Sequence, residues 1–180
     1  DVCVTSANAQ KIVEALPNQN IFFIPDKNLG GYIAKSSSKN IMLNDGFCPI
    51  HNEISTDTIA AMKAQHPEAK VLMHPECPED TLELADYIGS TSGIIQHVAE
   101  EPNGIYLIVT ENGVLWELEN KYPEATFLFP EPMPICADMK KITLQKVHDC
   151  LKYNLNAVQI DEEKRKKALL PLERMLELAK

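Results

Sequence analysis

An internal repeat constrains this chain more than any other feature of its sequence. The Thr-Ser pair at 5–6 returns at 91–92, after 86 residues, and a helix-like segment follows each pair. The stretches 21–28 and 105–112 correspond after 84 residues, and each begins as an apolar run typical of a buried strand and ends in a polar turn. Matched segments at a nearly constant interval indicate a duplicated unit. We therefore expect two copies of one structure.

The order of elements within the copies predicts the fold class. A second strand-like stretch follows in each copy, at 41–43 and at 127–129, and each precedes a cysteine, Cys48 or Cys136. Strands that alternate with helices form parallel sheets flanked by helices. The predicted fold is α/β, with tandem pseudo-symmetric three-layer domains and short parallel sheets.

The domain limits follow from where each copy begins. The second copy opens with a strand at 71–73, for which the first copy has no counterpart. We therefore expect a truncated repeat at 1–68, a further repeat at 69–151, and a C-terminal strand and helix at 152–180. At least one strand and one helix are expected upstream of residue 1.

Local patterns predict several smaller elements. Short strands are expected at 2–4 and 157–160, and a helix is expected from Glu79 to Tyr87. A terminal helix should begin at Asp161 and contain Pro171. Its apolar residues recur at steps of three and four, so they share one face: Leu169, Leu172, Met175, Leu176 and Ala179.

Composition argues against two classes of partner. Lys and Arg number 17 against 26 Asp and Glu, and basic residues cluster only at 164–167, so nucleic acid is not an expected partner. No apolar run approaches the roughly 20 residues of a membrane helix. No signal segment opens the chain. We expect a cytoplasmic protein that does not contact a membrane.

Polar groups follow the ends of several predicted strands. In parallel α/β sheets ligands bind beyond these ends, where helix N-termini attract anions. The hydroxyls of Thr5-Ser6 and Thr91-Ser92 suit a carboxylate or phosphate, although such pairs also serve as simple helix caps. The imidazole and carboxylate of His74-Pro75-Glu76 can hold a substrate or move protons near neutral pH. A plain polar loop is the alternative there.

Cys48 and Cys136 occupy equivalent places in the two copies, 88 residues apart. Pseudo-symmetry would bring them to one axis, where thiolates suit a metal or an iron–sulfur cluster, and a third copy would supply a third ligand. Without a CxxC spacing, two buried thiols are the alternative. His51 could contact the ligands or a substrate. A zinc hydrolase using Cys48, His51 and His74 is weaker, because Cys-x-x-His alone falls short of a zinc signature.

The other three cysteines receive different interpretations. The count of five is odd, which argues against a disulfide framework. Cys3 lies in an expected strand and Cys150 in an expected helix, so both are predicted to be core thiols. Cys77 follows Glu76 directly but has no counterpart in the other copy, which leaves its role open.

Six segments of the chain together resemble successive signatures of the quinolinate synthase family. They occur in the order of the family and cover almost the whole chain: 4–9, 25–30, 46–51, 74–77, 89–93 and 136–144. The resemblance implies three pseudo-symmetric α/β domains around a central [4Fe–4S] cluster, with one cysteine from each domain. Cys48 and Cys136 match the second and third ligands, and the first domain and its cysteine are expected upstream of this chain.

The resemblance also implies a reaction. It is the condensation of iminoaspartate with dihydroxyacetone phosphate, which loses water and phosphate and yields quinolinate for NAD biosynthesis. The open fourth iron position of the cluster would act as a Lewis acid. An L-aspartate oxidase or dehydrogenase would be the partner that supplies iminoaspartate.

The same resemblance assigns roles to individual residues. Glu76 and His74 are expected to be catalytic. The positions that match or adjoin substrate-binding residues are Ser6, His51, His74, Pro75, Glu76, Ser90 and Thr91. The alternative function is a non-catalytic α/β ligand-binding module, or half of a split assembly that needs a separate first domain. Iron and sulfide content would distinguish these readings.

Overall fold

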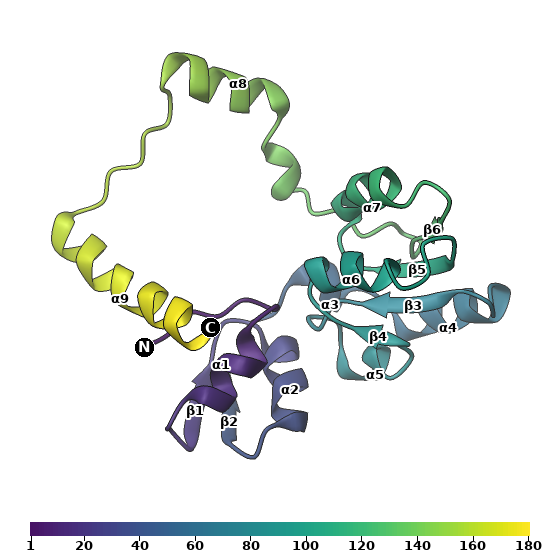
Figure 1. Cartoon of the computed structure of the whole chain (residues 1–180), viewed down its shortest axis with the longest axis horizontal. Helices are drawn as coiled ribbons and strands as arrows, with labels where there is room; N and C mark the ends of the chain where they lie inside the picture. Colours follow the sequence, from purple (N-terminus) through teal and green to yellow (C-terminus); the bar gives the residue numbers. More distant parts are fainter. The chain divides into compact units, whose positions relative to one another are not determined.

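The computed structural model describes residues 1–180 and divides them into two compact units. One unit is Thr5–Ile135, and the other joins Asp1–Val4 to Cys136–Lys180. Figure 1 traces the elements in chain order.

The larger unit contains a two-stranded parallel sheet. Its strands are β1 (Asn20–Phe23) and β2 (Asn40–Leu43), which pair in register from Asn20 with Asn40 to Phe23 with Leu43. Helix α1 (Ala9–Ala15) precedes β1, and α2 (Lys27–Ser36) connects the strands. A Cβ atom on Gly30 of α2 would lie 2.6 Å from a Leu43 methyl carbon, so α2 packs directly on the sheet because this residue is glycine.

A second sheet in the same unit has four parallel strands in the order β4-β3-β5-β6. They are β3 (Lys70–Met73), β4 (Tyr87–Ile88), β5 (Ile105–Val109) and β6 (Thr126–Leu128). The two central strands, β3 and β5, are buried along almost their whole length. Continuous apolar runs are typical of strands that are covered on both faces.

Helices cover both faces of this sheet. One core cluster packs α6 (Thr91–Val98) and α7 (Leu115–Lys121) against one face of the sheet. Its residues come from these helices and from alternate positions of β3 and β5: Leu72, Ile94, Ile95, Val98, Tyr106, Ile108 and Leu118. The other cluster packs α4 (Thr56–Gln65) and α5 (Glu79–Leu82) against the opposite face. Its residues come from these helices and from the intervening positions of β3 and β5: Ile59, Val71, Met73, Leu82, Leu107 and Val109. The arrangement has three layers, which confirms the predicted α/β fold class.

The order of elements is the same in the two matched stretches. Strand β1, helix α2 and strand β2 form one segment with two parallel strands, and β5, α7 and β6 form another. Helix α1 precedes β1, the first strand of one segment, and helix α6 precedes β5, the first strand of the other. One detail of the expectation was wrong. Phe22, in the stretch expected to be a buried strand, is 62% exposed, because this sheet is not covered on both faces as the second one is. Its strand partner Met42 is likewise 52% exposed.

Two predicted strands and the length of one helix were wrong. Segments 2–4 and 157–160 are not strands, because neither finds a neighbouring strand for a hydrogen-bonded ladder. Helix α5 ends at Leu82 instead of reaching Tyr87. The chain turns back there, the Asp86 carboxylate accepts the Val71 N–H at 2.8 Å, and Tyr87 enters β4.

The smaller unit contains the 3₁₀ turn η2 (Met139–Lys141) and two helices, α8 (Leu144–Tyr153) and α9 (Glu162–Leu178). Asp161 caps α9 by accepting the Lys164 N–H at 3.0 Å, and Pro171 lies inside the helix, as predicted. Neither α8 nor α9 has a buried residue. None of the helices combines the length and apolarity needed to cross a membrane.

The apolar face of α9 leads to a prediction about surface hydrophobicity. Leu169, Leu172 and Leu176 are 39%, 44% and 62% exposed, whereas scattered apolar residues are the norm for a monomer surface. We expect the chain to bind a hydrophobic fluorescent dye. The double variant Leu172→Gln, Leu176→Gln should lower the dye fluorescence at least about twofold, because it removes apolar surface. Glu173→Gln is the matched control, and equal fluorescence in all three proteins would contradict this prediction.

Candidate functional site

Six polar side chains of the larger unit converge near the C-terminal ends of β3 and β5. This site group consists of Ser6, Cys48, His51, His74, Glu76 and Thr110. His74 directly follows β3 and Thr110 directly follows β5. His51 lies in the short helix α3 (Pro49–Asn52), and Cys48 precedes it. The C-terminal edge of a parallel sheet is where α/β proteins bind ligands.

His74 is held as a neutral imidazole with a defined tautomer. Its Nδ1 accepts the backbone N–H of Glu76 at 3.4 Å, so the ring proton resides on Nε2. Nε2 lies 3.3 Å from the hydroxyl oxygen of Ser6 and donates to it. Burial, followed by the neighbouring His51 ring, lowers the pKa of His74 from 6.5 to about 4. This ring is therefore a hydrogen-bond donor at neutral pH.

The titration of His74 is a direct test of this environment. We expect its imidazole signals in NMR spectra of the metal-free chain to shift near pH 4 instead of near pH 6.5, with His74→Gln used to assign them. An unfolded chain takes up this proton below about pH 6.5, whereas the folded chain does not until about pH 4. This group should therefore make the fold less stable as the pH falls through that window. An inflection at or above pH 6 would contradict the description.

Glu76 approaches both histidine rings with one carboxylate oxygen. Its Oε2 is 3.2 Å from Nδ1 of His51 and 3.9 Å from Nδ1 of His74. The two rings stack at 4.5 Å between centroids. The His51 ring nitrogen stabilises the carboxylate and lowers the pKa of Glu76, and this outweighs the opposing effect of burial. Glu76 is thus ionised at neutral pH and can accept a proton.

His51 is fixed from its other side. Its Nε2 lies 3.0 Å from the hydroxyl oxygen of Thr110, which is buried. The contact between its Nδ1 and Glu76 is close but not aligned for a hydrogen bond, so Nδ1 is a buried nitrogen without a hydrogen-bond partner. Buried polar atoms in this state are uncommon and often belong to sites that take a ligand.

Cys48 carries a free, half-buried thiol beside this pair. Burial raises the pKa of the thiol, although the backbone N–H groups of His51 and Ile50 oppose the effect. The sulfur and the nearest ligand atoms of His51 and Glu76 all lie within 4.8 Å of one another, so the three residues could hold a metal ion. A metal would have to displace the thiol proton, so its binding would depend on pH.

The structure adds three residues that the sequence did not single out. Thr110 positions His51, Asp26 accepts the backbone N–H of Cys48 at 2.7 Å, and Asn28 donates to the backbone carbonyl of Glu76 at 2.9 Å. All three belong to the matched stretches 21–28 and 105–112, where polar residues follow a strand. Their position after a strand was the sequence signal that could have identified them as site residues.

The other candidate residues occupy different surroundings. Ser90 accepts the Gly93 N–H at 3.1 Å and so caps α6, and Thr91 is exposed in the first turn. Pro75 is buried next to His74. Cys136 belongs to the smaller unit, so its place beside Cys48 stays a prediction. The zinc hydrolase alternative used Cys48, His51 and His74 as ligands. In the structure the third residue that lies close to Cys48 and His51 is Glu76 instead of His74.

Two of the remaining cysteines now have defined environments. Cys77 is fully buried and points towards the Val109 carbonyl, and burial raises the pKa of its thiol to about 12. It is a core thiol. Cys150 was also predicted to be a core thiol, and this prediction was wrong. Its thiol is exposed because α8 has no buried face.

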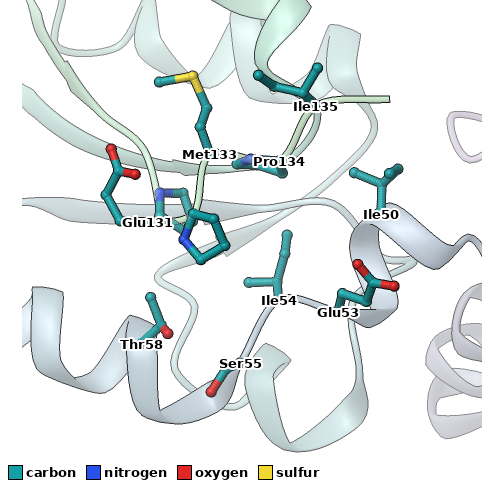
Figure 2. Close-up of a pocket in the computed structure, with 11 residues that line it drawn as sticks. Ile50, Glu53, Ile54, Ser55, Thr58, Glu131, Met133, Pro134 and Ile135 are labelled. Atoms are coloured by element: carbon teal, nitrogen blue, oxygen red, sulfur yellow. The ribbon is translucent and has the colours of Figure 1, made fainter. Parts of the chain in front are cut away.

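A pocket of about 290 Å³ lies beside α3 but does not include the site group. Its apolar walls come from Ile50, Ile54 and Met133, and Glu53 and Glu131 also line it (Figure 2). Its only titratable side chains are these two glutamates, without a histidine or a cysteine beside them. The site group, where perturbed groups converge, is therefore the better candidate for chemistry.

Comparisons with a family model and with individual known proteins all point to one family. The sequence model of the family described as "Quinolinate synthetase A protein" matches residues 1–177. Quinolinate synthase of Fusobacterium nucleatum is 47% identical over 180 residues, and the match covers 99% of this chain and 60% of that protein. Quinolinate synthase of Clostridioides difficile is 44% identical, with 99% and 59% covered. Quinolinate synthase 2 of Methanosarcina acetivorans is 38% identical, with 99% and 58% covered. The chain spans about 60% of the length of these curated relatives.

Proposed function

Because the chain belongs to the quinolinate synthetase A family, we propose that it provides two cluster thiolates and the substrate-handling residues of a quinolinate synthase. The reaction would condense iminoaspartate with dihydroxyacetone phosphate to quinolinate in NAD biosynthesis. The observation that carries the proposal is the convergence of Cys48, His51, His74 and Glu76 at one sheet edge. The relatives carry the name quinolinate synthase, which supports this proposal.

The residues present fit an iron–sulfur cluster in part. Cys48 is free and half-buried, and the unpaired Nδ1 of His51 beside it suits a site that receives a ligand. Cys48 and Cys136 would each supply a thiolate to a [4Fe–4S] cluster, and a third cysteine would come from polypeptide outside the match. Once bound, the cluster would supply a Lewis acid for dehydration.

The chain's own residues would bind the substrate and move its protons. Glu76, ionised beside His51, would accept a proton from the substrate at a carboxylate oxygen. His74 would donate its Nε2–H either to Ser6, as in the free chain, or to a substrate oxygen. Pro75, buried between these two residues, would fix their spacing.

A second part of the proposed site is the N-terminus of α6. Ser90 and Thr91 lie there, and a helix N-terminus presents free N–H groups and a partial positive charge. They would bind the phosphate or a carboxylate of a substrate. An L-aspartate oxidase or dehydrogenase would supply iminoaspartate, and the cytoplasm would be the location.

A split assembly is the second candidate, because the match covers only about 60% of each relative. The test is to produce this chain anaerobically with the part of the Fusobacterium nucleatum relative that lies outside the match. We expect the purified complex to contain about four iron and four sulfide per pair of chains and to form quinolinate from the two substrates. A complex that assembles but holds no iron would refute the proposal. The chain alone should hold no cluster.

A further inference from the structure

Asp26 joins the end of β1 to the loop that carries Cys48. It is 5% exposed, and both of its carboxylate oxygens accept backbone N–H groups. Oδ1 accepts from Leu29 at 2.8 Å, and Oδ2 accepts from Cys48 at 2.7 Å. The backbone adds a third link, because the Lys27 N–H donates to the Gly46 carbonyl at 2.7 Å.

The loop lies directly against the end of β1. A Cβ atom on Gly46 would lie 2.5 Å from the Pro25 carbonyl oxygen, a distance that side-chain carbons do not reach. The Asn44 side chain also donates to that oxygen at 2.9 Å. The backbone before Cys48 is therefore held in place before any metal binds.

Helix capping alone does not explain an aspartate at this position. One oxygen is enough to cap α2, and Ser, Thr or Asn would supply it. The second N–H, from Cys48, needs a second acceptor, and only a carboxylate offers two acceptor oxygens in this space. An asparagine would turn its NH₂ group towards one of the two N–H donors. The contact with Cys48 is thus the feature that selects a carboxylate.

The repeat supports the same interpretation. The residue that corresponds to Asp26 after 84 residues is Thr110, which positions His51. In both copies the first polar residue after the strand hydrogen-bonds to a member of the site group, Cys48 or His51. At this matched position only the first copy has a carboxylate, next to the residue expected to ligate iron.

Resting on the proposed function, we infer that Asp26 is a positioning residue for Cys48 that also lowers the reduction potential of a cluster bound there. Its charge is buried beside the Cys48 backbone, so adding an electron to the cluster costs more free energy. It also occupies the Cys48 N–H, which then cannot donate to a cluster sulfur. Net charge and hydrogen bonds to sulfur are two determinants of cluster potential.

The anchoring part is tested on the metal-free chain by amide exchange measured with NMR. Asp26→Ser can still cap α2 but cannot reach Cys48. We expect the Cys48 amide to exchange at least about tenfold faster, since a hydrogen bond to a charged group is lost, while the Leu29 amide changes much less. Asp161→Ser makes the same change in the cap of α9 at an exposed site, so it is the control and should change neither amide. If Asp26→Ser does not fold, Asp26→Thr, which also keeps a capping oxygen but has no second acceptor for Cys48, replaces it.

The redox part is tested on the cluster-loaded complex with Asp26→Asn, with Asp161→Asn as the control. We expect a more positive midpoint potential for Asp26→Asn alone. An unchanged or more negative potential, with a full complement of iron, overturns the tuning role and leaves the proposed function intact. Unchanged exchange at Cys48 overturns the anchoring role. A wild-type complex without a cluster overturns the proposed function and the redox part together, whereas the exchange result still decides the anchor.

Discussion

Replacing Glu76 by glutamine should lower the turnover of the assembled enzyme by at least about 100-fold, the range lost when a general base is removed. The amide has the same shape as the carboxylate but cannot accept the proton. It also cannot carry the negative charge that the His51 ring nitrogen stabilises at 3.2 Å. The rate of quinolinate formation under saturating substrates measures the effect.

The iron content and visible spectrum of this variant should not change, because Glu76 is assigned to the substrate and not to the cluster. Glu79→Gln is the matched control. Glu79 is exposed and pairs with Lys35 at the surface, so its variant should turn over normally. Loss of the chromophore in Glu76→Gln would count against the assigned role and in favour of metal ligation by Cys48, His51 and Glu76.

Serine at position 48 or 136 should remove at least about nine-tenths of the bound iron, because a hydroxyl replaces a thiolate ligand poorly. Iron and sulfide analysis of the anaerobically purified complex measures this. The matched controls are the three other cysteines, Cys3, Cys77 and Cys150, whose serine variants should keep the cluster.

Among these controls Cys77→Ser carries a separate cost. Its thiol is buried in the core, so a hydroxyl there should lower the free energy of unfolding by about 1–3 kcal/mol, the penalty of a poorly paired buried polar group. Its melting temperature should therefore fall while its iron content stays. A cluster that survives Cys136→Ser would falsify the ligand assignment.

The fold was largely predictable where apolar runs have partners nearby. The run at 105–109 forms β5 in the centre of a sheet, as its composition indicates. The run at 157–160 is also largely apolar but forms no strand. The difference is the presence of a neighbouring strand, a property of the tertiary structure that a local pattern does not contain.

The site was predictable in its positions but not in its contacts. His74 and Glu76 stand out because they follow a strand directly, and both reach the site group. The roles of Thr110 and Asp26 depend on which neighbour each side chain meets across the fold. Those neighbours, His51 and Cys48, lie 59 and 22 residues away in the sequence.

The bonds that orient the site group also bear on how a duplicated protein evolves. Ser6 with His74, Asn28 with the Glu76 backbone, and His51 with Thr110 each join a residue of the first copy to one of the second. Neither copy contains a complete constellation. The two copies are therefore not interchangeable modules. A substitution on one side should change which side chains are tolerated on the other, so we expect the two copies to vary together.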